Sequence, residues 1–271
     1  MATTPTPTPE PGAWPRWRLL ATIAGVVLTA VTLLIGLGIA VWTTLVTAPA
    51  PPPRTEEAAA FQGEVRGDAY RDQLAAQPML RVPAAAASTP DVSAALAPTL
   101  AVAVPDAVGP AGVPTGFPHN PEGAVAQLAA IEVTVVEAMS IPFAHQVHDA
   151  WSLPGGTSAA EWTLTRNVQV FLNTLGDQGN AKDDSVLVTA TPAAGQVKGT
   201  DGPDWVLACV LLDVRAAVAT TARIGYGHCE RMSWHDGRWQ IGPGTPPAKA
   251  PSTWPGSDLA VQAGWRTWQT G

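Results

Sequence analysis

The feature that most constrains this chain is an uncharged, proline-free apolar run from Leu19 to Val46. At about 1.5 Å of rise per residue, a helix over this run is roughly 40 Å long, whereas the hydrocarbon core of a bilayer is about 30 Å thick. Fifteen of its 28 residues are Leu, Ile or Val, and together they favour insertion by about 5 to 9 kcal/mol. The run therefore predicts one transmembrane helix over residues 19–46.

The charges beside the predicted span indicate its orientation. Arg16 and Arg18 precede it, whereas the first cation after it is Arg54. Positive charges gather on the cytoplasmic side of membrane proteins. We therefore expect residues 1–18 to be a cytoplasmic tail, and we expect the C-terminal domain of a single-pass cell-membrane protein to lie outside the cytoplasm.

A cleaved secretory signal peptide is the alternative interpretation, because Ala48-Pro-Ala50 resembles a small-residue cleavage site. The apolar run is about twice the usual length of a signal-peptide core, and proline follows both alanines, which we expect to hinder cleavage. These two features favour an uncleaved anchor in the lipid bilayer. Gly36 and Ala40 are spaced like a helix-dimer face, so a homo-oligomer is also an open possibility.

Proline frequency separates a linker from a folded domain. Residues 47–115 are rich in Pro and Ala and are expected to form a linker, in which only Thr55–Gln77 is free enough of proline for a helix. Residues 116–247 have the periodicity of one extracytoplasmic domain. Residues 248–271 follow it as a tryptophan-rich C-terminal tail.

Three helices are predicted at the start of the domain. The first begins after Asn120, a good N-cap that is followed by proline at the first helical position. The second follows Pro142. The third opens with the capping-box pair Ser158 and Glu161 and stops at Gly176.

Beyond residue 180 the pattern changes to that of strands. Four strands are expected, over Ser185–Thr191, Asp204–Val214, Thr221–Trp234 and Trp239–Ile241. Asp236-Gly237 is a strong hairpin signal between the last two. Helices followed by an antiparallel meander predict an α+β domain, a cone-like unit of three helices packed on a four-stranded antiparallel sheet.

The two cysteines, Cys209 and Cys229, lie on the two long predicted strands. In a hairpin centred near Val218 and Ala219 they are directly opposite each other. Opposed strand residues have Cα atoms about 4.5 to 5.5 Å apart, at the short end of the disulfide range, and a bridge persists outside the cytoplasm. A disulfide is therefore favoured over a pair of small buried thiols.

Few residues in the domain indicate chemistry. His145 and His148 share a helix face with the spacing of a metal pair, with Asp149 beside them, but no other ligand cluster accompanies them. A solvated polar face is therefore favoured, and no metal, cofactor or catalytic residue is assigned. The sequence has no nucleophile elbow, phosphate loop or dinucleotide fingerprint, so we do not expect an enzyme.

Glu132 stands out because it falls within the apolar arc of the first predicted helix. If it points inward near Trp162 or Trp205, these three residues form a candidate pocket in which a carboxyl of raised pKa acts as an acid or base. If it lies at the edge of the arc, its carboxylate reaches water. The second arrangement is favoured, because a buried unpaired Glu is costly.

The charge balance bears on partners. The net charge is −7, with only 15 Lys plus Arg in 271 residues and no basic cluster outside the arginines beside the span. Neutralising phosphates requires concentrated cations. Direct binding of nucleic acid is therefore not expected.

The order of tail, span, linker, three helices and terminal meander resembles bitopic membrane proteins with a nuclear-transport-factor-two-like cone domain, such as type IV secretion and conjugation scaffolds. Residues 116–126, 254–260 and 263–265 are similar to segments of membrane proteins of conjugative mobile elements in GC-rich Gram-positive bacteria. The resemblance implies a non-enzymatic, membrane-anchored scaffold or accessory component of a conjugative DNA-transfer apparatus. Its implied partners are other envelope or conjugation-machinery proteins, and it carries over no catalytic residues.

Two other functions remain open. An extracytoplasmic small-molecule-binding or catalytic cone domain would be favoured by a deep, polar-lined cavity, and a secreted cell-wall-associated protein would follow from signal-peptide cleavage. For the scaffold, Trp254, Trp265 and Trp268 form the candidate interface, because aromatic residues anchor protein contacts. In the alternative, which is somewhat favoured, the tail folds back and covers the sheet.

Overall fold

A computed structural model of the chain describes residues 64–176, 179–217 and 221–271. The predicted cytoplasmic tail and the transmembrane helix over residues 19–46 lie outside the described residues. Within the described ranges, no helix has the length and apolar character needed to cross a bilayer.

The described part of the chain is an α+β domain with five α-helices. The helices are α3 (Asp68–Ala76), α4 (Pro121–Ala138), α5 (Ile141–Trp151), α6 (Thr163–Thr174) and α7 (Asp258–Gln262), with 3₁₀ turns η1 (Ala84–Ala87) and η2 (Pro110–Gly112). The strands are β1 (Thr99–Val102), β2 (Ala107–Val108), β3 (Pro114–Thr115), β4 (Leu187–Thr200), β5 (Trp205–Ala217), β6 (Thr221–His235), β7 (Arg238–Ile241) and β8 (Arg266–Thr270). The predicted α+β class is confirmed.

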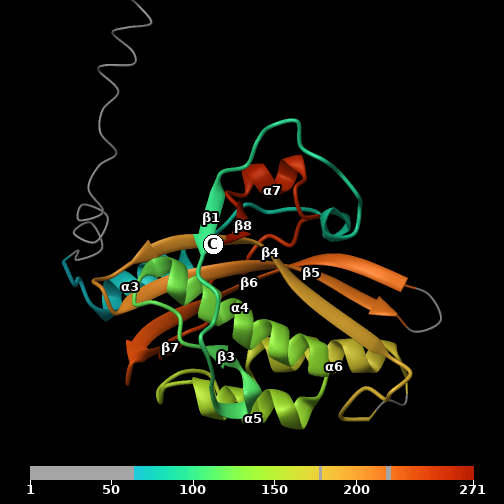
Figure 1. The fold of residues 1–271 in the computed structure, drawn as a ribbon, viewed down its shortest axis with the longest axis horizontal. Helices are drawn as coiled ribbons and strands as arrows, with labels where there is room; N and C mark the ends of the chain where they lie inside the picture. Colours follow the sequence, from blue (N-terminus) through green and yellow to red (C-terminus); the bar gives the residue numbers. More distant parts are fainter. Residues whose placement is uncertain (1–63, 177–178, 218–220) are drawn as a thin grey trace, which may run out of the picture. The chain divides into compact units, whose positions relative to one another are not determined.

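Six strands form one mixed sheet in the order β1-β8-β4-β5-β6-β7, and β2 pairs separately with β3 (Figure 1). Strands β4 to β7 are contiguous and antiparallel, as the sequence predicts. The predicted four-stranded sheet is nevertheless too small, because β8 pairs antiparallel with β4 and parallel with β1.

The two added strands come from segments that were not expected to join the sheet. Residues 47–115, expected as a linker, contribute α3 and β1 to β3 from Asp68 onward, and the tail over residues 248–271 contributes α7 and β8. Thr99 of β1 is paired with Thr267 of β8. The local sequence pattern of a strand does not predict its pairing with a strand so far away in the sequence.

Strand β4 is longer than the expected Ser185–Thr191. Its register against β5 shifts between Pro192 and Ala194 and again between Val197 and Gly199. Such β-bulges allow a strand to contain Pro and Gly without ending. The strand therefore continues past residues that are usually read as strand breakers.

The first predicted helix begins where the sequence places it. The Asn120 side chain caps α4 by accepting a hydrogen bond from the Gly123 N–H at 2.7 Å. The third helix begins later than predicted, at Thr163, and the Ser158 hydroxyl donates to the Glu161 carboxylate at 3.1 Å within the preceding turn. Helix α4 is the central helix of the domain and packs against both β4 and β5.

Alternate residues of β5 point to opposite faces of the sheet, which we call the helix face and the outer face. The helix-face residues pack with α4, α5 and α6 in the main core: Val206, Ala208, Val210, Leu212 and Val214. The outer-face residues pack with α3 or with the C-terminal segment: Trp205, Leu207, Cys209 and Leu211. In Figure 1, α4 to α6 lie below the sheet and α7 lies above it.

The predicted disulfide between Cys209 and Cys229 is present. The two residues are direct partners across β5 and β6, with Cα atoms 4.0 Å apart. The same register pairs Ala217 with Thr221, so the hairpin is centred where the sequence predicts. Because Cys209 points to the outer face, the bridge joins the two central strands beneath the C-terminal segment.

The C-terminal segment lies directly on β6 because two glycines leave room for it. A Cβ atom at Gly225 would overlap the Thr253 carbonyl oxygen, and one at Gly227 would lie 2.6 Å from the Pro251 carbonyl oxygen. The indole N–H of Trp265 donates to that Pro251 oxygen at 3.2 Å, and the Trp265 side chain is buried. The segment is therefore an integral cover of the outer face.

Candidate functional site

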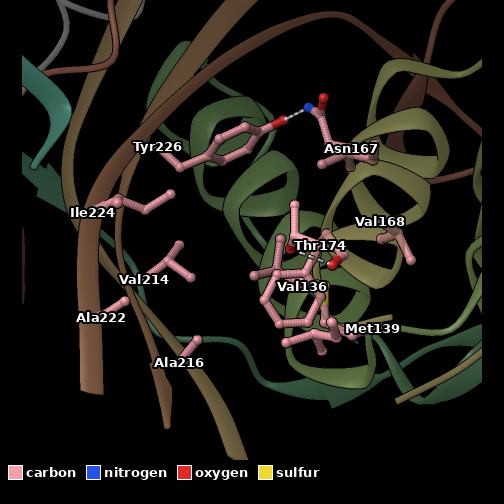
Figure 2. A pocket seen from close by; sticks show the side chains of 13 residues that line it. Val136, Met139, Asn167, Val168, Thr174, Val214, Ala216, Ala222, Ile224 and Tyr226 are labelled. Carbon is pink, nitrogen blue, oxygen red and sulfur yellow. Dashed lines mark hydrogen bonds between the residues drawn. The ribbon is translucent and has the colours of Figure 1, made fainter. Parts of the chain in front are cut away.

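A cleft of about 410 Å³ lies on the helix face, between α6 and the free end of the β5–β6 hairpin (Figure 2). Val136 near the C-terminal end of α4 and Met139, the residue that caps this end, also line it. No lining residue is charged, and only Asn167, Thr174 and Tyr226 are polar, so the cleft is not the polar-lined cavity expected from the sequence for a small-molecule-binding domain. This volume and this lining are typical of sites for small organic molecules, which are mostly apolar with a few polar groups.

Small side chains on the hairpin make the space. Ala216 of β5 and Ala222 of β6 are direct cross-strand partners, and both face the cleft. On the opposite wall, Val168 and Phe171 of α6 face them. Because two methyl groups stand where larger side chains would meet the helix, the wall of the hairpin does not fill the gap.

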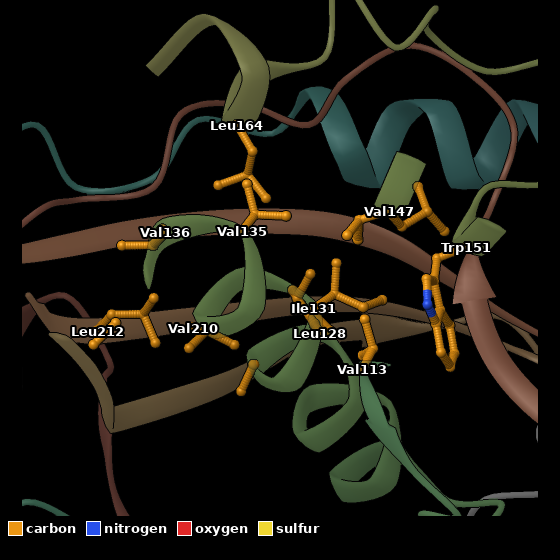
Figure 3. Close-up of a cluster of buried hydrophobic side chains, with 14 of the residues drawn as sticks. Val113, Leu128, Ile131, Val135, Val136, Val147, Trp151, Leu164, Val210 and Leu212 are labelled. Carbon is orange, nitrogen blue, oxygen red and sulfur yellow. The ribbon is translucent and has the colours of Figure 1, made fainter. Parts of the chain in front are cut away.

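The same layer of the domain is filled closer to α5 (Figure 3). There, Leu128, Ile131 and Val135 of α4 pack in one cluster with Trp151 of α5, and all four side chains are fully buried. The cleft is therefore a local feature of one end of the helix face.

A hydrogen bond between α6 and β6 crosses the layer at one end of the cleft. The Asn167 side-chain amide donates to the Tyr226 hydroxyl at 2.7 Å. In the hydrogen bonds between described residues, the Tyr226 hydroxyl only accepts and the Asn167 side-chain oxygen has no partner. One hydroxyl donor and one amide acceptor thus remain available at the cleft.

Beyond Tyr226, polar side chains continue along the helix face of β6. The rings of Tyr226 and His228 are stacked with centroids 6.1 Å apart. The Nε2 atom of His228 lies 3.0 Å from Oε1 of Glu230, and the Trp162 indole N–H donates to the same oxygen at 2.8 Å. We call Tyr226, His228 and Glu230 the β6 polar row.

Glu132 of α4 faces the β6 polar row, and its side chain is fully buried. Neither carboxyl oxygen has a hydrogen-bond partner among the described residues. Burial raises the pKa of Glu132 to about 8, a shift that His228 opposes and Glu230 reinforces. Glu132 is therefore mainly a neutral carboxylic acid at pH 7.

The sequence-based expectation that the Glu132 carboxylate reaches water is wrong. Helix α4 lies at the centre of the domain and contacts the sheet, α5 and α6, so that no edge of its apolar arc meets solvent near this residue. The raised pKa explains how the burial is tolerated, because a neutral acid costs far less to bury than a carboxylate.

The buried environment also affects the other two titratable groups. Burial favours neutral His228, but the hydrogen bond that its ring donates to the Glu230 carboxylate and the charges of Glu132 and Glu230 outweigh this effect and raise the pKa of His228. Burial and the nearby Glu132 raise the pKa of Tyr226 as well. The Tyr226 hydroxyl therefore remains protonated and able to donate a hydrogen bond.

The predicted pocket residues separate in the structure. Trp162 joins Glu132 on the helix face through Glu230. Trp205 instead lies on the outer face, where it packs with Leu74 of α3. Its inclusion in the candidate pocket is wrong, because the strand pleat turns it away from α4.

The histidine pair on α5 is not a solvated polar face. His148 is buried with its ring centroid 5.3 Å from that of Trp162, while its Nδ1 atom lies 3.5 Å from the Asp149 carboxylate. His145 is half-buried. Within the described ranges, no group of three or more His, Cys, Asp and Glu side chains could hold a metal ion.

The candidate interface tryptophans occupy different environments. Trp265 is only 2% exposed, so it offers no surface to a partner. Trp254 and Trp268 are half-buried, and the Arg223 guanidinium lies 4.2 Å from the ring centroid of Trp254. Only these last two keep area that a partner protein could contact.

Asn167 and the β6 polar row were not predicted from the sequence. The register of the cysteine pair contained part of the signal, because residues 226, 228 and 230 must point away from the face of Cys229. The pair does not reveal which face the helices cover. That information required the packing of α4 and α6 against the sheet.

The arrangement combines an apolar cleft with a buried acid and histidine that do not line it. The cleft can enclose an apolar molecule and offer it one donor and one acceptor. Comparison of the chain with protein-family models, with curated proteins and with solved structures finds no match.

Proposed function

We propose that the domain binds a small apolar molecule in the cleft between α6 and the β5–β6 hairpin, outside the cytoplasm. The observation that carries this proposal is an uncharged lining that surrounds a space of about 410 Å³. The lining has few polar groups, and two of them, Asn167 and Tyr226, are hydrogen-bonded to each other at one end. Sites for small molecules have this size and this balance of apolar and polar groups.

Burial of apolar ligand surface is the expected source of affinity. At about 25 cal/mol per Å², a ligand that buries roughly 200 Å² gains about 5 kcal/mol before the cost of association. The lining already presents Phe171, Leu175 and Ile224 to this space. Ligand binding would therefore remove apolar protein surface from water as well.

Filling the cleft tests the proposal. Binding of the neutral fluorescent probe N-phenyl-1-naphthylamine to the full-length chain would be measured by titration. Ala222→Trp is expected to lower its affinity at least tenfold, because the indole occupies the space between Ala216 and α6. Thr221→Trp is the matched control, since the neighbouring side chain is exposed and does not line the cleft.

Equal probe binding by the parent, Ala222→Trp and Thr221→Trp chains would show that the probe binds elsewhere and would overturn the proposal. Partition of the probe into lipid or detergent is common to all three chains. The difference between the two tryptophan variants therefore isolates the cleft.

A second function rests on the N-terminal part of the sequence. We propose that the chain is also a membrane-anchored scaffold or accessory component of a conjugative DNA-transfer apparatus, with envelope proteins as partners. The apolar run over residues 19–46 and the resemblance to proteins of conjugative elements support this role. Deleting the gene should lower the transfer frequency of its element, and an unchanged frequency with the element's other genes intact would remove this candidate.

A further inference from the structure

We infer that the cleft selects an uncharged molecule with an apolar chain and one hydroxyl group, a medium-chain alcohol in chemical class, and that Tyr226 and Asn167 bind the hydroxyl. This inference rests on the proposed function and deepens it. It follows from which polar groups at the cleft are unused, from the charges around it and from its size.

The polar end of the cleft matches a group that both donates and accepts. The Tyr226 hydroxyl accepts from Asn167 and keeps its own proton available, while the Asn167 side-chain oxygen has no partner among the described residues. An alcohol can accept from the first and donate to the second. A ligand without a hydroxyl leaves both groups dependent on water.

The charges around the cleft disfavour an ionised ligand. A carboxylate would find no cation in the lining, because none of the lining residues is charged. Arg223, the nearest cation in sequence to Ala222, is bound to Asp213 at 2.7 Å and lies over the ring of Trp254. The polar end is partly open to solvent, so a ligand carboxylate there would lose only part of its water, but it would gain no counter-charge; an anionic chain should therefore bind more weakly than the alcohol.

The groups behind the polar end add to this selection. His228, the one basic side chain in the β6 polar row, is already bound to Glu230 at 3.0 Å. Glu132 lies nearby and is buried without a hydrogen bond. A ligand carboxylate would therefore find no unpaired cation behind the polar end either. A ligand ammonium would in turn find no ionised carboxylate in the lining.

The volume limits the length of the ligand. One water molecule takes up about 30 Å³ of liquid, so about 410 Å³ equals roughly fourteen water volumes. A ligand of about ten to fifteen non-hydrogen atoms fits this space. 1-Decanol lies within this range.

Displacement of N-phenyl-1-naphthylamine from the full-length chain at pH 7.5 tests the class directly. The competitors are 1-decanol, decanoate, decylammonium and 1-chlorodecane, which share one chain length and differ in the terminal group. We expect 1-decanol to displace the probe at a concentration roughly threefold to tenfold below that of 1-chlorodecane, as one or two hydrogen bonds imply. Decanoate and decylammonium should each require at least tenfold more than 1-decanol.

Two variants assign the preference to its residues. Tyr226→Phe and Asn167→Ala should each reduce the preference for 1-decanol over 1-chlorodecane to about twofold or less. Tyr70→Phe is the control for the first variant, because Tyr70 lies on α3 at the outer face. Asn173→Ala is the control for the second, because Asn173 is exposed on the same helix and does not line the cleft.

The outcomes separate the inference from the proposed function. If all four competitors displace the probe equally from the parent chain, and Ala222→Trp still weakens binding of the probe, the cleft binds apolar molecules but the hydroxyl preference is wrong. Decanoate that binds as tightly as 1-decanol also overturns the class. If every competitor displaces the probe equally from the parent chain and from Ala222→Trp, the proposed function fails and the inference fails with it.

Discussion

The two faces of the sheet differ in how each holds one almost fully buried acid, Asp201 on the outer face and Glu132 on the helix face. On the outer face, the Asp201 carboxylate accepts hydrogen bonds from Arg66 N–H, Gly67 N–H and Arg71 Nε at 2.6, 3.0 and 2.6 Å. Buried Arg231 is paired with the Asp72 carboxylate at 2.8 Å. On the helix face, Glu132 is buried without any hydrogen bond among the described residues, close to a cleft.

The buried acid of the outer face stabilises the fold, whereas the helix face keeps polar groups that are available to a ligand. The hydrogen bonds to Asp201 outweigh the effect of burial and lower its pKa, so that a carboxylate holds the start of α3 against the sheet. The helix face retains an orphan acid, an open volume and an unused hydroxyl donor at Tyr226. Polar groups that lack hydrogen-bond partners within the fold are expected at binding sites.

The largest expected loss of stability comes from the cover of the outer face. Trp265→Ala should lower the free energy of unfolding by about 3 to 5 kcal/mol, because it removes a large buried side chain and its hydrogen bond to Pro251. Urea unfolding followed by fluorescence measures this. Trp268→Ala is the comparison, since that side chain is half-buried and should cost clearly less. Equal small losses for both would mean that the tail does not form part of the core.

The disulfide should rank next. Replacing Cys209 and Cys229 together by alanine should cost about 3 kcal/mol in the chain-entropy model, because the bridge closes a loop of 20 residues. Urea unfolding with and without reductant checks this value. Reductant should destabilise the parent chain and leave the double variant unchanged. If the parent is insensitive to reductant after full reduction is verified by mass spectrometry, the bridge does not stabilise the outer face.

The buried acid of the helix face, Glu132, predicts that stability depends on pH, with an effect slightly smaller than that of the disulfide. The pKa of Glu132 rises from 4.5 to about 8 on folding, so its contribution is fully present below pH 4.5 and is lost as the pH rises through 8. Through Glu132 alone, raising the pH from 6 to 8 should lower the free energy of unfolding by about 2 to 3 kcal/mol, because one group contributes no more than about 1.4 kcal/mol per pH unit. The raised pKa of His228 acts in the same direction.

Glu132→Gln should flatten this pH profile and make the domain more stable than the parent at pH 8. Glu137→Gln on the same helix is the control, because Glu137 is exposed and its hydrogen bond from the Ala190 N–H can also be accepted by the amide oxygen of Gln. A parent stability that is constant or increases between pH 6 and 8 would contradict a neutral Glu132 in the folded domain.

The smallest effect is expected at the exposed edge of the outer face. Arg223→Ala removes the pair with Asp213 and the contact with the Trp254 ring, yet it should cost about 1 kcal/mol or less, because Arg223 is partly exposed to solvent. The effect should shrink further in high salt. A loss as large as that of Trp265→Ala would place this pair among the main supports of the outer face.

The local signals in the sequence were sufficient for much of the fold. Asn120 caps α4 because its side chain and the following proline suit a helix start, and both act within one turn. Cys209 and Cys229 fall opposite each other because a hairpin between two regular strands has one register once its centre is known. The class and the four central strands followed from the change of apolar period.

The tertiary structure alone decided the rest. Whether Glu132 met water depended on how completely the sheet, α5 and α6 surround α4, and the pairing of β1 with β8 joined segments more than 160 residues apart in the chain, as Thr99 and Thr267 show. The cleft likewise exists because Ala216 and Ala222 meet across a hairpin opposite α6. Burial, strand pairing and cavities each depend on residues far apart in the chain, whereas caps, turns and apolar periods depend on neighbours. The sequence alone therefore determined the helices and strands of the central domain, whereas packing determined the added strands and the site.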